Sequence, residues 1–293
     1  MSRWVIRGLG AGIRTTSYPA GPERRSSPTL VQLDAGQLTP EAALAAGRVC
    51  PTDAIVVTGD DRKGNLAFDA GQCVMCGRCL RAAPAAFRYV ADPEVAVRSR
   101  DSLRTRVTWA AGKCDRVHGP EPRSETVGES GTDLTQETTR LVDELHSRAM
   151  RIFKRSLHIR HVDAGSCNGC EAELQMLATP RYDLARLGLF FTPTPRHADC
   201  LLVTGIVTRQ MEAALVRTYE SMPNPKMVVA VGVCAIGGGC FTDSPTRTGP
   251  LDRILPVDVY VPGCPPTPLA LLHGLLLATG KAEERYMAGR AGS

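Results

Sequence analysis

The chain has 293 residues, of which 43% are hydrophobic and 22% are charged, so it is long enough to form two buried cores. The formal net charge of +5 is modest and spread along the sequence, which makes a nucleic-acid partner unexpected. The eleven cysteines are clustered and odd in number, and the sequence does not open on a signal peptide. A secreted disulfide framework is therefore not expected, and reduced, metal-binding thiols are favoured.

The first 30 residues are expected to form an N-terminal amphipathic segment. Residues 1–25 are basic and carry apolar side chains at roughly helical spacing: Trp4, Val5, Ile6, Leu9 and Ile13. Two interpretations are open, a short helix on a membrane or partner subunit and a frayed basic terminus. The longest apolar run, 268–279, is shorter than the about 20 residues that cross a bilayer, so the protein is expected to be soluble or peripheral.

Residues 31–100 are predicted to form a small α+β domain, with a helix at 41–47, strands at 55–57 and 66–68, and a cysteine-rich loop. Residues 101–135 are expected to be a linker, because Gly, Pro, Glu, Ser and Thr dominate from residue 118. The stretch 136–156 predicts a basic amphipathic helix. Such a helix could pack on its own domain or lie on a membrane surface.

Residues 157–281 alternate between strands and helices. Strands are predicted at 159–162, 189–192, 200–203, 227–231 and 257–261, and helices at 171–178, 210–219 and 268–278. The Val and Leu runs lack polar alternation, which indicates strands that are covered on both faces. We therefore expect an α/β fold with a flavodoxin-like, mainly parallel sheet, followed by a tail at 282–293.

The N-terminal domain contains a C-x2-C-x2-C motif of the bacterial ferredoxin type, formed by Cys73, Cys76 and Cys79. Upstream, Cys50-Pro51 has the form of the fourth position of a preceding motif. The spacing predicts that these four cysteines hold one 4Fe–4S cluster. All four ligand positions of a companion cluster are replaced together, by Pro40, Ala43, Ala46 and Ala83, so a single cluster is expected in this domain.

The second half contains four more cysteines that follow apolar, β-rich runs: Cys167, Cys170, Cys234 and Cys264. Each is close to Gly or Pro, and the carboxyl ends of parallel strands meet at one edge of a sheet. Four thiolates at that edge would suit a second 4Fe–4S cluster or a structural zinc ion. Of the other cysteines, Cys200 is expected to be a buried apolar residue. Cys240 is a possible alternative ligand, and Cys114 has no assigned role.

These motifs resemble two subunit types fused in one chain. Residues 1–100 are similar to the ferredoxin-type subunit of complex I and of energy-converting nickel–iron hydrogenases. The later half resembles the small iron–sulfur subunit of those complexes and of formate hydrogenlyase, which is homologous to the complex I 20 kDa subunit. The stretches that carry this second resemblance are 156–160, 162–171, 195–199 and 256–266. The two-residue gap between Cys167 and Cys170 resembles the hydrogenase side, because the complex I version has adjacent cysteines.

The resemblance implies an electron-transfer subunit of a membrane-associated, complex-I-like nickel–iron hydrogenase with two 4Fe–4S clusters. Its implied partners are a hydrogenase-type large subunit that carries the active site, the membrane subunits of the complex, and an upstream electron donor or acceptor protein. The implied location is the cytoplasmic face of the cell membrane. Glu171, next to Cys170, is either a carboxylate favoured by its helix terminus or a proton-transfer group. The alternatives are a subunit of a quinone-reducing NADH dehydrogenase and a zinc-stabilised scaffold.

Overall fold

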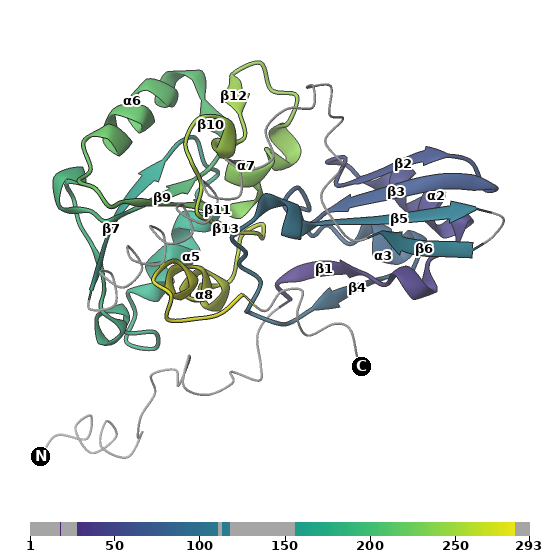
Figure 1. Ribbon diagram of the computed structural model, residues 1–293, viewed down its shortest axis with the longest axis horizontal. Coiled ribbons are helices and arrows are strands. Elements are labelled where there is room, and N and C mark those ends of the chain that lie inside the picture. Colours follow the sequence, from purple (N-terminus) through teal and green to yellow (C-terminus); the bar gives the residue numbers. More distant parts are fainter. Residues whose placement is uncertain (1–17, 19–27, 111–112, 118–155, 285–293) are drawn as a thin grey trace, which may run out of the picture.

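The computed structural model describes residues 18, 28–110, 113–117 and 156–284. Figure 1 shows that these residues form two lobes, an N-terminal lobe of residues 28–117 and a C-terminal lobe of residues 156–284. The expected segments at 1–17 and 136–155 and most of the tail lie outside the described residues. Within the described part of the chain, no helix is long and apolar enough to cross a membrane.

The C-terminal lobe is built on a five-stranded sheet. Its strands, in spatial order, are β13 (Val259–Val261), β11 (Met227–Val231), β9 (Cys200–Thr204), β7 (Leu157–Asp163) and β8 (Leu189–Phe191). Every neighbouring pair is parallel. In chain order this is the 2-1-3-4-5 arrangement of flavodoxin-like folds, so the predicted α/β class and parallel sheet are confirmed.

Helices cover both faces of this sheet. Figure 1 shows α5 (Gly169–Leu177) and α8 (Pro268–Ala278) on one face and α6 (Arg209–Glu220) on the other. The short helix α7 (Gly232–Ile236) follows β11 directly, and a small antiparallel pair joins β10 (Val207–Thr208) to β12 (Arg247–Gly249). All five residues of β9 and of β11 are buried, because both faces of a parallel sheet are covered.

The N-terminal lobe is α+β with antiparallel sheets. Strand β1 (Leu30–Leu33) pairs with β4 (Phe87–Val90), and the helices α2 (Pro40–Val49) and α3 (Arg78–Ala82) pack against each other. Helix α2 begins where the sequence favours it, since the Thr39 hydroxyl accepts a hydrogen bond from the Ala42 N–H and Pro40 follows the cap.

A second, four-stranded sheet corrects the expected linker at 101–135. Its strands, in spatial order, are β2 (Ile55–Gly59), β3 (Lys63–Asp69), β5 (Arg104–Ala110) and β6 (Lys113–Val117), and each neighbouring pair is antiparallel. Val107 and Trp109 are buried and alternate with more exposed neighbours, which is the pattern of a half-covered strand. The N-terminal lobe therefore extends about as far as residue 117.

Three of the four positions that lack the companion cluster's cysteines are packed into the core. Ala43 and Ala46 on α2 are fully buried, and Ala83, which ends α3, is 4% exposed. Small apolar side chains here let α2 and α3 approach closely. Buried alanine side chains therefore occupy three of the companion cluster's four ligand positions.

Residues 95–98 of the N-terminal lobe contact the C-terminal lobe. Val97 forms an isolated antiparallel bridge to Tyr260 of β13, with N–O distances of 3.0 and 2.8 Å. The Ala96 N–H donates to Nδ1 of the buried His273 on α8, at 3.2 Å. Arg98 donates to the Leu277 carbonyl at 2.6 Å. The segment thereby covers the edge of the C-terminal sheet and one side of α8.

Candidate metal centres

The first cysteine set gathers around one cavity of the N-terminal lobe. Cys50 follows the end of α2, Cys73 and Cys76 lie on the loop before α3, and Cys79 lies within α3. All four line the same pocket, together with apolar residues such as Val31 and Phe68. The structure therefore brings together the four residues that the spacing predicts.

Burial makes two of these thiols, Cys73 and Cys79, poor acids in the chain alone. It raises the pKa of Cys73 to about 12, and the other thiols of the set add to this shift. The pKa of Cys79 rises to about 11 for the same reasons, burial first. A cation at the centre would reverse this effect, because it stabilises the thiolate form that binds metal. Cys76 is exposed, so the site reaches the surface of the lobe on its side.

The shape of the first loop depends on tight backbone turns. Met75 and Gly77 both have positive φ angles, 58° and 71°. The Tyr89 hydroxyl donates to the Met75 carbonyl at 3.0 Å. Burial and then the charge of Cys76 raise the pKa of Tyr89, which indicates that its ring lies beside the thiols. The sequence motif did not single out Tyr89, because this residue lies on strand β4, outside the motif.

The second set lies at the carboxyl edge of the parallel sheet, as expected from its contexts. Cys167 and Cys170 follow β7, Cys234 lies in α7 directly after β11, and Cys264 follows β13. The strand ends that carry these residues are not adjacent in sequence, yet the sheet places them at one edge. Cys167 is exposed, and the other three are partly buried.

These four thiols interact electrostatically with one another. Burial raises the pKa of Cys170, and the neighbouring Glu171, Cys234, Cys264 and Cys167 raise it further. Burial also raises the pKa of Cys234, to about 12. Gly232 has a φ of 79°, and a methyl group added to it would lie 2.7 Å from the Cys170 sulfur. The absence of a side chain at Gly232 therefore leaves room for this thiol.

Each set offers four thiols, a donor set that 4Fe–4S clusters and structural zinc ions both use. Among the described residues, no group of three His, Cys, Asp or Glu side chains is arranged to hold one metal ion. A 4Fe–4S cluster binds each of its four thiolates through a different iron atom, so its ligands need not converge on one point. The donor chemistry, four thiols in each set, fits such a cluster.

Glu171 is a buried carboxylate beside the second set. It lies in the first turn of α5 and is 9% exposed. Within the described part of the chain, neither of its oxygens has a hydrogen-bond partner. Oε1 is 3.8 Å from Nε2 of His161, whose pKa is lowered by burial and raised by Glu171. Sequence reasoning did not identify His161, because only the fold places β7 beside α5.

The remaining cysteines differ in their surroundings. Cys200 lies in β9 and is fully buried, which confirms its predicted role as an apolar core residue. Cys240 is exposed, and its charge contributes to the raised pKa of Cys234 and of Cys264. The side chain of Cys114 lies outside the described residues.

The loops that carry the two cysteine sets touch each other. Gln72, next to Cys73, donates from Nε2 to the Gly237 carbonyl at 3.4 Å. A methyl group on Gly239 would lie 3.6 Å from Val74 on the other side of Cys73. The segment after Cys234 therefore packs directly on the loop around Cys73.

The chain is similar to several known proteins. The family model described as "NADH ubiquinone oxidoreductase, 20 Kd subunit" matches residues 167–278, a range that contains the entire second cysteine set. A probable membrane-bound hydrogenase subunit of Pyrococcus furiosus is 54% identical over 131 residues, which cover 45% of this chain and 78% of the relative. Formate hydrogenlyase subunit 7 of Escherichia coli is 43% identical over 147 residues, which cover 50% and 58%.

Among solved structures, a chain of the membrane-bound sulfane sulfur reductase, described as an archaeal respiratory membrane complex, is 38% identical with a TM-score of 0.40. The match covers 48% of this chain and 76% of that one.

The sequence relatives are subunits of hydrogenase and other oxidoreductase complexes, and this chain is of that class. It belongs to the family of the NADH ubiquinone oxidoreductase 20 Kd subunit.

Proposed function

We propose that the chain is an electron-transfer subunit of a membrane-associated nickel–iron hydrogenase complex. The N-terminal lobe is a ferredoxin-type domain that holds one 4Fe–4S cluster on Cys50, Cys73, Cys76 and Cys79. The C-terminal lobe holds a second on Cys167, Cys170, Cys234 and Cys264. When bound, such clusters supply one-electron redox chemistry at potentials set by hydrogen bonding, charge and solvent exposure.

The observation that carries this proposal is the direct contact between the two cysteine loops. Gln72 and Val74 flank Cys73, and both approach the glycine-rich segment that follows Cys234. A protein that used its thiols only for stability would have no need to bring two separate sets together. Adjacent redox sites on one chain favour electron passage from one lobe to the other.

The two sites differ in the partner that each would meet. Cys76 is exposed in the N-terminal lobe, so an external donor or acceptor protein could dock there. Cys167 is exposed at the edge of the parallel sheet, which we propose as the contact for the large catalytic subunit. The whole assembly would sit on the cytoplasmic face of the membrane through other subunits.

Glu171 is the candidate proton-transfer group of this face. It is buried beside the second cysteine set, without a hydrogen-bond partner among the described residues. A buried carboxylate of this kind is more often functional than an exposed one, because its charge costs free energy unless a partner or a proton neutralises it.

Iron content and electron paramagnetic resonance of the anaerobically purified chain test the proposal. Two clusters require about eight iron atoms per chain. Stoichiometric zinc without iron would support the scaffold alternative and refute electron transfer. About twelve iron atoms would mean that a further cluster has ligands outside the two sets.

The choice between a hydrogenase and a quinone-reducing NADH dehydrogenase depends on the partner. The family description includes the latter, whereas the two relatives described above are a probable membrane-bound hydrogenase subunit and a formate hydrogenlyase subunit. Hydrogen-dependent reduction of the clusters in the native complex would support the hydrogenase. Reduction by NADH alone would support the alternative.

A further inference from the structure

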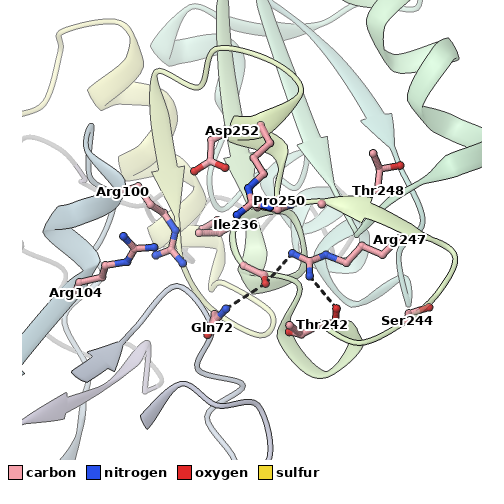
Figure 2. A pocket seen from close by; sticks show the side chains of 13 residues that line it. Gln72, Arg100, Arg104, Ile236, Thr242, Ser244, Arg247, Thr248, Pro250 and Asp252 are labelled. Carbon is pink, nitrogen blue, oxygen red and sulfur yellow. Dashed lines mark hydrogen bonds between the residues drawn. The ribbon is translucent and has the colours of Figure 1, made fainter. Parts of the chain in front are cut away.

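A cavity of about 440 Å³ lies where the two lobes meet. Gln72, Arg100 and Arg104 line it from the N-terminal lobe. The C-terminal lobe contributes Ile236, Gly237, Thr242, Ser244, Arg247, Thr248, Gly249, Pro250, Asp252 and Arg253. Figure 2 shows Arg100 and Arg104 on one side and Arg247 on the other. Among the described residues that line this cavity are four arginines and a single acidic residue, Asp252.

Carboxylates outside the cavity neutralise two of these arginines. Arg100 forms a bidentate pair with Asp69, with both N–O distances at 2.6 Å. Arg104 also reaches Asp69, at 3.4 Å, and pairs with Asp101 at 3.1 Å. Their charges are therefore largely compensated within the protein.

The other two arginines form no ion pair within the described part of the chain. Arg247 donates to the carbonyls of Gly237 and Thr242, both at 3.0 Å, but its Nε is buried without a partner among the described residues. Arg253 is exposed and forms no ion pair within the described part of the chain. Burial, and next the charge of Arg253, lowers the pKa of Arg247, and the charge of Asp243 partly opposes this shift. The two like charges therefore act on each other.

We propose that this cavity binds a small molecule with a phosphate or similar multivalent oxyanion group, held by Arg247 and Arg253. Guanidinium groups bind such anions through paired, charge-assisted hydrogen bonds. The cavity volume lies in the range of small-molecule pockets, about 300–1,000 Å³, and exceeds what a bare phosphate needs. The anion could come from free phosphate or from a phosphate ester such as a nucleotide.

A ligand at this position would contact both lobes at once. Gln72 precedes Cys73, and Gly237 follows Cys234 by three residues, so the anion would lie near both cysteine sets. Binding would also stabilise the packing of the lobes, because a ligand that binds only the folded form raises its stability. The proposal does not depend on the identity of the metal centres.

Isothermal titration of the full, anaerobically purified chain tests this site with three probes: inorganic phosphate, pyrophosphate and ADP. We expect saturable binding of at least one probe in the millimolar range or tighter. Arg253→Gln should weaken it about tenfold or more, as expected for the loss of a hydrogen bond to a charged group. Arg247→Gln should do the same. Arg62→Gln, on the exposed turn between β2 and β3, is the matched control and should bind like the wild type.

Tighter binding of ADP than of phosphate would identify a phosphate ester as the ligand, and equal binding would identify the free anion. Iron content and thermal unfolding of each variant show that it is folded. Absence of saturable binding for all three probes would overturn the proposal. So would equal affinities for the wild type and Arg253→Gln. If Arg253→Gln instead blocked assembly of the complex without any probe binding to the wild type, the cavity would be a subunit contact and the small-molecule proposal would be wrong.

Discussion

Substituting Gly232 by alanine should remove the C-terminal cluster and leave the N-terminal one. A methyl group at this position would lie 2.7 Å from the Cys170 sulfur, whereas an ordinary contact begins at 3.4 Å, so the sulfur must move by about 0.7 Å. Metal–ligand distances tolerate only about 0.2 Å. The positive φ of 79° adds about 1–2 kcal/mol of backbone strain for any residue with a side chain.

The assay is iron content together with electron paramagnetic resonance of the anaerobic protein. Gly232→Ala should retain about four of the eight expected iron atoms and only the signal of the first cluster. Gly169→Ala is a matched control at the same site, because its added methyl would lie 3.5 Å from the Cys167 sulfur, an ordinary contact. We expect this variant to keep both signals. Full iron content in Gly232→Ala would refute Cys170 as a ligand held against Gly232.

Three further predictions follow from the same geometry. Cys76→Ser should abolish the signal of the first cluster and spare the second, and loss of both signals would mean that the sites depend on each other. Glu171→Gln should lower the rate of hydrogen evolution by the native complex about a hundredfold, with unchanged iron content. Glu173→Gln, on the same helix, is the control and should not lower this rate. Equal losses in the two variants would refute a specific proton-transfer role for Glu171. The third prediction concerns iron-free protein. Unfolded thiols lose their protons near a pKa of 9.0, whereas burial raises the pKa of folded Cys73 to about 12. The free energy of unfolding should therefore fall as pH rises from about 9 to about 12. Urea midpoints at successive pH values measure this slope, and Cys73→Ser should reduce it; an unchanged slope would contradict the burial of this thiol.

The sequence predicted the parallel sheet well because its signals are local. The Val and Leu runs of β9 and β11 are continuous, and only a strand covered on both faces needs such a run. The cysteines could be grouped into sets because each lies next to a strand end or within a short motif. The cavity shared by the first set and the mutual pKa effects within the second set were then found in the structure.

The features that were missed depend on contacts between remote segments. The expected linker contains strands β5 and β6, in which Val107 and Trp109 alternate as in a half-covered strand. The composition of the following residues obscured that short signal. The approach of His161 to Glu171 and the arginine-lined cavity arise only when the fold joins separate elements, so no local pattern could reveal them.

Helix α8 explains why the lobes are held in one arrangement. Ten of its residues are buried, so it has no polar face, and a helix that is apolar all round must be covered on every side. The sheet covers one side of α8, and Ala96 covers another side near Gly274. A side chain on Gly274 would clash with Val261 of β13. The residues 95–97 are themselves fully buried. Separating the lobes would therefore expose both surfaces to water, and burial of apolar area is favourable by about 25 cal/mol per Å². The same packing that completes the C-terminal core thus keeps the Cys73 loop against the segment after Cys234, so the relation between the two proposed clusters is set by folding.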